Sequence, residues 1–287
     1  MENLLQSLLE QCNGFSELMS IIVVTSGSTD RTPHIVKKYA SLNHKIRYVW
    51  EDERKGKAEA VNRILSLCEG EVTLFISADT LPASGSIENL LKGFVHPVVG
   101  AISGHPVPVN NPKSLFGRIA RLIWNTHHEI AAFETRLKTF FHISGEMCAI
   151  RNGIVEKVPE DIINEDTFIG WEIKKKGYEV VYVPEAVVYM KAPESVGDLY
   201  RQRKRVVQGH LQVHKRAKAK VTTVNPLQVI FFLTKSLQIN ARDLLALTLA
   251  TFVETLAHIK ARIDLRRDIL PYKWTTVNTT KVAIRLT

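Results

Sequence analysis

Residues 71–82 read EVTLFISADTLP, and the fold can be predicted outward from this stretch. The apolar, β-branched run at 72–76 predicts a short strand buried on both faces. The run ends at Ser77-Ala78-Asp79, and Pro82 should stop the hydrogen-bonded ladder because proline has no backbone N–H. In open α/β sheets, ligands bind beyond the carboxyl ends of the strands. Asp79 is therefore a candidate ligand for a divalent metal that holds a diphosphate, the simpler alternative being that it caps a turn.

Two strand–helix units precede this stretch. SIIVVT at 20–25 predicts a strand, and Gly27 within the Ser/Asp-rich segment after it predicts a sharp turn into a helix over about 30–42. IRYVW at 46–50 predicts a second strand, and Lys57 opens the next helix. A leucine-rich amphipathic helix at 2–11 comes first. The alternation of strands and helices predicts a parallel sheet with right-handed crossovers.

The second half of the chain continues the α/β pattern. Further helices are expected at 86–94, 110–137, 164–176 and 195–220, and further strands at 98–103, at 142–150 with an interruption at Ser144-Gly145, and as a short pair around Pro184. The stretch from 195 to 220 is strongly basic. We place a domain boundary near Lys220, which gives an α/β domain at 1–220 and a helical region at 221–287.

Composition restricts the classes of protein and partner. The 287 residues, 45% of them hydrophobic and 23% charged, can form one large α/β domain plus an appendage. A net charge of +9 predicts an anionic partner: nucleic acid, a phosphate-bearing substrate or anionic lipid. The three cysteines have no paired spacing, which indicates a reducing compartment and no structural zinc. We expect no cleavable signal sequence.

The helical region contains two apolar segments, at 226–240 and 244–259. Lys235 and Glu254 interrupt them, so each uninterrupted run is about half of what a spanning helix needs. The segments are typical of amphipathic helices that lie on a bilayer, with the preceding basic stretch facing anionic lipid. Two helices packed on the core are an equally good interpretation of the pattern.

Two further stretches carry side chains suited to chemistry. Glu165 and Asp166 stand in the first turn of a predicted helix, where the helix dipole favours the ionised carboxylate and keeps Asp166 available as a proton acceptor. Gln202 and Arg205 share one helix face, and a guanidinium can neutralise a leaving diphosphate. The simpler interpretations are an Asn-capped helix and a solvated or membrane-facing basic helix. We interpret His210 and His214 as surface residues, and His127-His128 as packing residues, and not as metal ligands.

Six short motifs are weak singly but specific as an ordered set. They are SGSTD at 26–30, GKAEAVN at 56–62, SAD at 77–79, SGE at 144–146, NED at 164–166 and QRKRV at 202–206. Together they resemble family-2 glycosyltransferases, most closely the membrane-associated branch that includes poly-N-acetylglucosamine, hyaluronan and cellulose synthases. The resemblance covers roughly residues 2–215. It implies the GT-A fold, a mostly parallel α/β sheet flanked by helices, and an inverting transfer from a nucleotide-diphospho-sugar.

The resemblance also implies roles for individual residues. It makes Asp166, beside Glu165, the general base that deprotonates the acceptor hydroxyl. Asp79 would bind Mg²⁺ or Mn²⁺, and the remaining candidates are Ser28, Asp30 and Lys57 for the nucleotide-sugar and Gln202, Arg203 and Arg205 for the acceptor and diphosphate. A base, a metal-binding carboxylate and a guanidinium are also what an in-line displacement of a diphosphate requires.

Four departures from the family pattern are visible. Ser77 replaces the first Asp of Asp-x-Asp, Thr25-Ser26 replace acidic residues near the base, and Val206 replaces a Trp. The family's first central strand has no counterpart, which predicts a sheet with a gap and an exposed edge. These departures keep open a truncated or degenerate protein without catalysis.

The resulting hypothesis is a metal-dependent, inverting glycosyltransferase at the cytoplasmic face of the cell membrane. Its donor would be a nucleotide-diphospho-sugar, in the first instance UDP-linked, and its acceptor a lipid-linked sugar or a glycan. An anionic membrane surface is an expected partner. A basic nucleic-acid-binding α/β module is the rival from another class. It is disfavoured because the basic run lacks interleaved aromatic residues that could stack on bases, so nucleic acid is not an expected partner.

Overall fold

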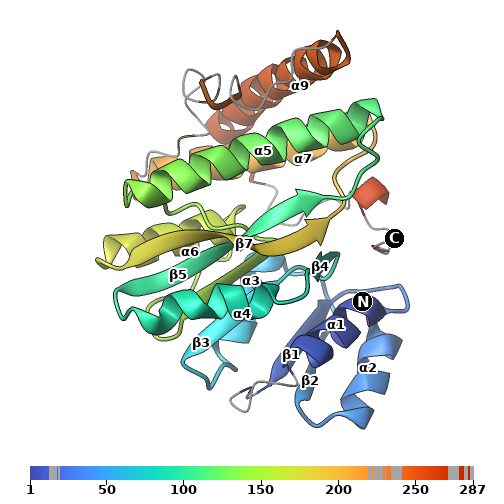
Figure 1. Ribbon diagram of the computed structural model, residues 1–287, viewed down its shortest axis with the longest axis vertical. Coiled ribbons are helices and arrows are strands. Elements are labelled where there is room, and N and C mark those ends of the chain that lie inside the picture. Colours follow the sequence, from blue (N-terminus) through green and yellow to red (C-terminus); the bar gives the residue numbers. More distant parts are fainter. Residues whose placement is uncertain are drawn as a thin grey trace.

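The computed structural model describes residues 1–12, 18, 20–218, 222, 229, 231–233, 241–270, 278–280 and 284. The strands are β1 (Ile21–Ser26), β2 (Ile46–Glu51), β3 (Val72–Ile76), β4 (Thr80–Pro82), β5 (Val99–Pro108), β6 (Met147–Arg151) and β7 (Glu179–Met190). The helices are α1 (Glu2–Cys12), α2 (Thr32–Leu42), α3 (Lys57–Leu65), α4 (Ser86–Lys92), α5 (Leu115–Arg136), α6 (Glu165–Lys175), α7 (Val196–Ala217) and α9 (Ala241–Arg266). Most predicted elements are therefore present, in the predicted order (Figure 1).

The strands form two hydrogen-bonded sheets. β1 and β2 pair in parallel, and a second sheet has the order β3-β6-β5-β7-β4. In the second sheet only β5 and β7 are parallel, whereas β3–β6, β5–β6 and β4–β7 are antiparallel. The prediction of a mostly parallel sheet is thus wrong in detail. It was based on the βαβα rhythm of the first half, and the antiparallel partners β6 and β7 come from the second half.

The predicted gap in the sheet is present. Among the described residues no ladder joins β1 or β2 to β3, so β3 pairs with β6 along one edge alone. Burial reflects this position, because Thr73 is the only fully buried residue of β3. Phe75 packs on one apolar cluster and Leu74 on the other, so the prediction of a strand buried on both faces is confirmed only in part.

Two prolines were expected to interrupt strands. Pro82 is the last residue of β4, a three-residue strand at the edge of the five-stranded sheet, so strand structure ends at this proline as predicted. Pro184 does not divide a strand pair, since β7 runs continuously from Glu179 to Met190 and the irregularity appears as a register shift opposite Ser103 and His105.

The five-stranded sheet separates two apolar layers. Alternate residues of β6 face opposite sides: Cys148 and Ile150 pack with α3, α5 and α6, whereas Met147 and Ala149 pack with α4. Within the described part of the chain, α3, α5 and α6 thus contribute to one apolar layer and α4 to the other. This packing fixes the ends of β3 and β6, which carry the candidate site residues.

Helix α9 packs against α5 and α7 through a shared apolar cluster that contains Ile119, Leu199, Ala246 and Val253. Three ion pairs reinforce the contact: Arg118–Asp243 at 2.6 Å, Arg203–Glu254 at 2.7 Å and Lys204–Asp264 at 2.9 Å. Figure 1 shows α9 stacked on the α5–α7 layer, away from the sheet. The described part of 221–287 thus shares its apolar contacts with the preceding region, and the domain boundary near Lys220 stays a prediction.

The apolar segment at 244–259 lies within α9, so the predicted helix over this segment is confirmed. By length and composition alone, Arg242–Arg266 could cross a membrane. Glu254, which interrupts the apolar run in the sequence, accepts hydrogen bonds from Arg203 of α7. Most of the other segment, 226–240, lies outside the described residues.

Candidate active site

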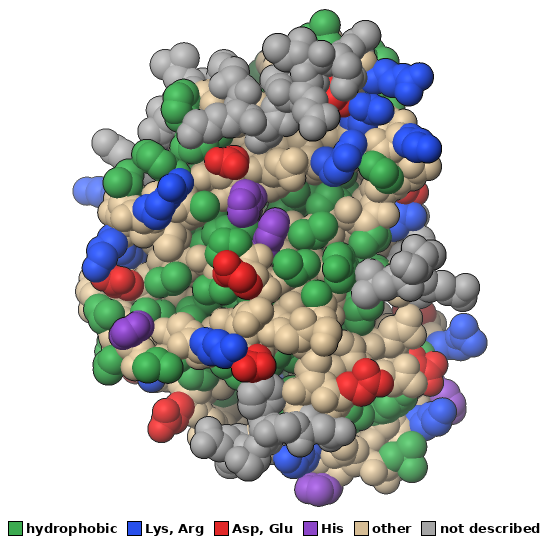
Figure 2. Space-filling view, viewed as in Figure 1, with side chains coloured by type: hydrophobic (Ala, Val, Ile, Leu, Met, Phe, Trp, Pro, Cys, Tyr) green, Lys and Arg blue, Asp and Glu red, His purple; other side chains and the backbone are tan. Residues whose placement is uncertain are grey.

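A cavity of about 850 Å³ lies between the ends of β1 and β3 and the helices α5, α7 and α9. Ser26 is the last residue of β1, Asp79 lies just beyond β3, and Asp166 lies in the first turn of α6. A cavity therefore lies beyond the carboxyl ends of these strands, where the ligand site was predicted. In Figure 2, histidine and acidic side chains lie near the middle of the visible face of the molecule, among hydrophobic side chains.

Lys57 and Glu165 both line the cavity and form an ion pair in which the carboxylate is buried and the lysine is partly exposed. Lys57 Nζ lies 2.6 Å from Glu165 Oε1, and Glu165 is only 3% exposed. Burial alone would lower the pKa of Lys57, but the attraction of Glu165 and Asp166 raises it overall. The ion pair links Lys57, at the start of α3, to Glu165 in the first turn of α6. The roles predicted for Glu165 in catalysis and for Lys57 in nucleotide binding stay predictions.

Asp166 differs from Glu165 because its Oδ2 lies beside the loop of residues 144–146, which borders the cavity. Its Oδ1 accepts hydrogen bonds from the Thr167 backbone N–H at 2.6 Å and from Thr167 Oγ1 at 3.2 Å. A Cβ added at Gly145 would lie 2.6 Å from Asp166 Oδ2, so this oxygen sits directly beside the 144–146 loop. Asp166 is half-buried and lines the cavity, which suits a base that must reach an incoming hydroxyl.

Asn164 does not cap α6 with its side chain, contrary to the simplest interpretation of the sequence. Its Nδ2 donates to the Val206 carbonyl on α7 at 3.1 Å. A Cβ at Gly209 would lie 2.2 Å from the Asn164 side chain, so glycine is needed for this close approach. Asn164 therefore fastens the N-terminus of α6, and with it Asp166, to the helix that carries Gln202 and Arg205.

Glu146 is a site residue to which the sequence analysis assigned no role. Its Oε2 accepts a hydrogen bond from Ser144 Oγ at 2.6 Å, and it lines the cavity with Asp79 and Asp166. Burial raises the pKa of Glu146, and the two aspartates add to the rise against the opposing effect of Lys57. The motif SGE was noticed, but nothing local distinguishes its Glu from a surface residue.

Asp79 is the residue that fits a metal best. It is exposed at the cavity and stands near Glu146. The described residues contain no group of three or more histidine, cysteine or acidic side chains that could hold a metal ion by themselves. Mg²⁺ and Mn²⁺ do not need such a group when a diphosphate supplies the other oxygens, because one or two carboxylates then suffice. The residues therefore fit a cation that binds together with a diphosphate.

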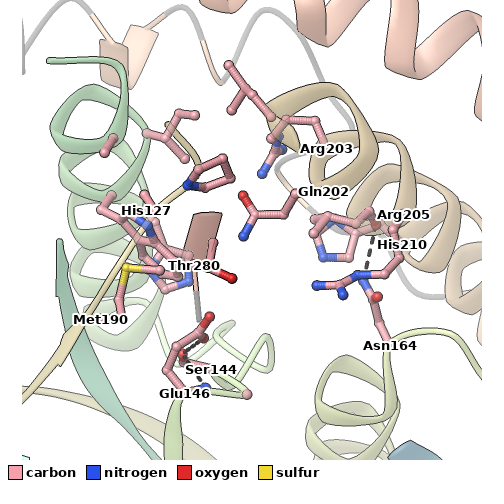
Figure 3. Close-up of a pocket in the computed structure, with 18 of the residues that line it drawn as sticks. His127, Ser144, Glu146, Asn164, Met190, Gln202, Arg203, Arg205, His210 and Thr280 are labelled. Atoms are coloured by element: carbon pink, nitrogen blue, oxygen red, sulfur yellow. Dashed lines mark hydrogen bonds between the residues drawn. The ribbon is translucent and has the colours of Figure 1, made fainter. Parts of the chain in front are cut away.

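The three candidates on α7 separate into two groups. Gln202 and Arg205 point into the cavity opposite His127 and Met190, as Figure 3 shows. Burial lowers the pKa of Arg205, and the nearby carboxylates Glu165, Glu146, Asp166 and Asp79 oppose that effect. Arg203 borders the cavity but turns its guanidinium to α9, where Nε and Nη2 donate to Glu254 at 2.7 and 3.0 Å. The i, i+3 spacing predicted that Gln202 and Arg205 share a face. Arg203 was predicted for the same acceptor and diphosphate site, and that role stays a prediction.

Two predicted nucleotide residues are not brought to the cavity. Ser28 and Asp30 are absent from its lining, and Asp30 Oδ1 accepts a hydrogen bond from the Thr32 backbone N–H at the start of α2. Gly27 has a φ of +57° and makes the turn that carries them away. Their role in nucleotide binding stays a prediction.

The histidines also differ from expectation. His210 is 3% exposed, so its interpretation as a surface residue is wrong, whereas His214 is exposed as predicted. His210 Nε2 lies 3.0 Å from His142 Nε2, and both rings line the cavity together with His127. His128 packs on His105 and bonds to Tyr182 Oη, which agrees with a packing role. The basic sequence around His210 concealed the buried face of α7.

The comparison with known families identifies the class. The sequence profile of Glycosyl transferase family 2 matches residues 1–158, more than half of the chain. The chain belongs to this family.

Individual relatives agree with this membership. The chain is 29% identical over 202 residues to poly-β-1,6-N-acetyl-D-glucosamine synthase of Staphylococcus aureus (strain COL), covering 69% of this chain and 48% of the relative. It is 28% identical to the enzyme of the same name from Staphylococcus epidermidis, covering 67% and 48%. The chain thus spans about half the length of the curated relatives it matches.

Solved structures show the fold. The mannosyltransferase PcManGT from Pyrobaculum calidifontis, in complex with GDP-Man and Mn²⁺, aligns with a TM-score of 0.62 and 24% identity over 97% of this chain and 78% of that one. Staphylococcus aureus TarS in complex with UDP-GlcNAc aligns with a TM-score of 0.50 and 16% identity over 92% and 87%. The predicted GT-A fold is confirmed, with the mixed strand pairing described above.

Proposed function

We propose that this protein is an inverting glycosyltransferase that moves a sugar from a nucleotide-diphospho-sugar to an acceptor hydroxyl. The observation that carries the proposal is the convergence on one cavity of Asp166, Asp79 and Arg205. These groups can supply, in that order, a proton acceptor, a metal-binding carboxylate and a cation for the leaving diphosphate. Family membership supports the same class of reaction.

The chemistry follows from these positions. The acceptor oxygen attacks the anomeric carbon while the bond from that carbon to the diphosphate oxygen breaks, and the electron pair leaves with the nucleoside diphosphate. Asp166 takes the proton of the acceptor hydroxyl, and Arg205 offsets the charge that develops on the leaving oxygen. A divalent cation held by Asp79, when bound, supplies further neutralisation of that charge. Attack opposite to departure inverts the configuration at the anomeric carbon.

The donor class comes from the comparisons. The two staphylococcal relatives are named as synthases of an N-acetylglucosamine polymer, and TarS was crystallised with UDP-GlcNAc. We therefore propose UDP-GlcNAc as the first donor to test, with GDP-mannose second because PcManGT holds it. The acceptor would be a glycan or a lipid-linked sugar.

Calorimetric titration of the protein with UDP should show binding that requires Mn²⁺ or Mg²⁺. Asp79→Asn removes the proposed metal ligand and should weaken UDP binding in the presence of Mn²⁺ by about tenfold or more. Because the described residues contain no preformed metal cluster, Mn²⁺ alone should bind weakly until UDP is added. Asp161→Asn, which removes a partner of Arg216 outside the cavity, is the matched control. Absence of binding for both UDP and GDP would favour a degenerate protein instead.

We also propose that α9 lies on the cytoplasmic face of an anionic membrane. Leu245, Phe252, Leu256 and Ile263 form an exposed apolar stripe, at the helical spacing of seven, four and seven residues. The opposite face pairs with α5 and α7 through Asp243, Glu254 and Asp264, as described above. A helix that is charged toward its own protein and apolar outward suits the plane of a bilayer better than its centre.

Co-sedimentation with vesicles that contain phosphatidylglycerol tests the membrane proposal. Phe252→Asp combined with Leu256→Asp should reduce the bound fraction by about tenfold, because two charges replace apolar contacts. Leu42→Asp on α2, at a leucine that is 75% exposed, is the control and should bind like the wild type. Equal binding of all three proteins would remove α9 as the lipid-facing element.

A further inference from the structure

Glu146, the residue before β6, stands opposite Ser77, which replaces the first Asp of Asp-x-Asp. In the ladder between β3 and β6, Ile76 is paired with Met147. The hydrogen bonding continues one step further, because the Ser77 backbone N–H donates to the Glu146 carbonyl at 3.0 Å. Opposite residues of an antiparallel pair carry their side chains on the same face of the sheet. A carboxylate is therefore present one strand away from the position where β3 lacks it.

The Glu146 carboxylate has one oxygen that the protein binds and one that it does not. The Ser144 backbone N–H donates to Ser103 Oγ at 2.9 Å, and Ser144 Oγ donates to Glu146 Oε2 at 2.6 Å (Figure 3). Both serines are buried. Glu146 Oε1 has no hydrogen-bond partner in the described part of the chain, and the atom is not fully buried. The side chain is thus held in one orientation, with Oε1 accessible beside the cavity that Glu146 lines.

Ser77 itself offers no negative charge to a cation. Its Oγ donates to the Gly145 carbonyl at 3.1 Å, which commits the hydroxyl hydrogen to the 144–146 loop. Asp79, two residues further on, is exposed at the cavity. Asp79 and Glu146 therefore line the same cavity from two neighbouring strand ends, and they are the carboxylates nearest to the position of the missing aspartate in the β3–β6 ladder.

Carboxylates outnumber cations in the immediate surroundings of Glu146. Arg205 is close to four of them: Asp79, Glu146, Glu165 and Asp166. Lys57 is also near Glu146, but its ammonium is paired with Glu165 at 2.6 Å. Glu146 itself forms no ion pair within the residues that the structure describes. A diphosphate bound here would add further negative charge, so a further cation is needed to hold it.

Arg54 and Arg262 also line the cavity, but they do not neutralise Glu146. Both residues are exposed, Arg54 in the segment before α3 and Arg262 on α9. Water and salt screen exposed charges, whereas a divalent cation neutralises its ligands in direct contact. Mg²⁺ is usually bound in proteins through one or two carboxylates together with substrate phosphates. Two carboxylates at the edge of a diphosphate site match this mode of binding.

We propose that Glu146 is a second ligand, beside Asp79, for the divalent cation that binds with the donor diphosphate. Glu146 then supplies, from the start of β6, the carboxylate that Ser77 does not supply from β3. Ser144 is a positioning residue in this arrangement, because it holds Oε2 and leaves Oε1 accessible. This inference rests on the proposed glycosyltransferase function and adds a protein ligand to its metal site.

A role as the general base is the main alternative for Glu146. Both roles predict a loss of turnover when the carboxylate is removed, so turnover does not separate them. The Mn²⁺ requirement of UDP binding does, because a general base takes no part in holding the cation. Asp166 is the better base, since its place in the first turn of α6 favours the ionised carboxylate.

The test measures the Mn²⁺ dependence of UDP binding by calorimetry. UDP is titrated into the full chain at a series of fixed Mn²⁺ concentrations, and the Mn²⁺ concentration that gives half of the maximal UDP affinity is compared between variants. Glu146→Gln keeps the size of the side chain and an oxygen for the Ser144 bond, and it should raise this concentration about tenfold. Ser144→Ala releases the carboxylate from its orientation and should raise it about threefold. Glu156→Gln, at an exposed glutamate outside the cavity lining, is the matched control and should behave like the wild type.

A compensating substitution tests the cross-strand replacement itself. Ser77→Asp combined with Glu146→Gln returns a carboxylate to the end of β3, and it should bring the Mn²⁺ requirement back to within about threefold of the wild type. The melting temperature shows whether the double variant is folded. If the folded double variant keeps the defect of Glu146→Gln, the replacement of position 77 by position 146 is overturned, although Glu146 remains a metal ligand.

The other outcomes separate this inference from the proposed function. If the wild type binds UDP with Mn²⁺ and Glu146→Gln has the same Mn²⁺ requirement, Glu146 is not a metal ligand and the proposed function stands. UDP binding that needs no metal overturns the cation site as a whole, Glu146 included. If neither UDP nor GDP binds at any Mn²⁺ concentration, the proposed function fails, and this inference fails with it.

Discussion

Asp166→Asn should abolish measurable sugar transfer while UDP affinity stays within about twofold of the wild type. General-base catalysis contributes about 10²–10⁴-fold to rates, and Asn cannot accept the acceptor proton. The substitution keeps the size of the side chain and an oxygen that can accept the Thr167 hydrogen bonds, so the start of α6 should remain folded. Transfer is measured as UDP release with a saccharide acceptor present, and binding by calorimetry.

Two further substitutions in the same segment, one of them a control, help to interpret this result. Asp161→Asn, just before α6 and outside the cavity lining, should keep full activity. Glu165→Gln should reduce activity indirectly, because Lys57 loses its carboxylate partner. If Asp166→Asn retained wild-type turnover, Asp166 would not be the base, and Glu146 would become the next carboxylate to test because it lines the same cavity.

Local patterns predicted most elements of the fold. The run at 72–76 predicted the bounds of β3, and the repeated strand–helix alternation predicted β1, α2, β2 and α3 within a few residues. The antiparallel pairing of β6 with β3 and β5, and of β7 with β4, was not predictable in the same way. These partners are separated in sequence by tens of residues, and a short apolar run does not reveal the direction in which it will pair.

The site was predicted in its membership more than in its contacts. Of the residues that the motifs indicated, Lys57, Asp79, Asp166, Gln202 and Arg205 line the cavity, whereas Ser28 and Asp30 do not. The pairing of Lys57 with Glu165 and of Arg203 with Glu254 joins residues that lie far apart in the chain. Such partners depend on how α3, α6, α7 and α9 meet, which no single window of sequence contains.

The 144–146 loop connects these contacts. Ser77 Oγ donates to the Gly145 carbonyl at 3.1 Å, and the Ser77 backbone N–H donates to the Glu146 carbonyl at 3.0 Å. Lys57 Nζ lies 3.5 Å from the same Gly145 carbonyl. The loop thus ties the end of β3, which leads to Asp79, to the ion pair beneath Asp166. Ser77, a departure from the family's Asp-x-Asp, has a structural role here.

Gly145→Ala should therefore lower kcat by about 10²-fold without unfolding the protein. An added Cβ would lie 2.6 Å from Asp166 Oδ2 and 2.8 Å from Lys57 Nζ, closer than side chains tolerate. Both atoms lie at the ends of side chains, which can move. The fold should therefore adapt, while the Asp166 carboxylate and the Lys57 ammonium are displaced. A displacement of about 1 Å from the reactive geometry costs about 10²-fold in rate.

Gly197→Ala is the matched control for that substitution. Gly197 is exposed in the first turn of α7, and a Cβ there would meet only the Arg201 side chain, at 3.8 Å. Both variants should unfold within a few degrees of the wild type, and only Gly145→Ala should lose turnover. The donor affinity of Gly145→Ala should fall less than its kcat, since Asp79 and Arg205 are not displaced directly. Full turnover in Gly145→Ala would mean that the 144–146 loop does not constrain Asp166 Oδ2. The proposed positioning of Asp166 and Lys57 by this loop would then have to be abandoned.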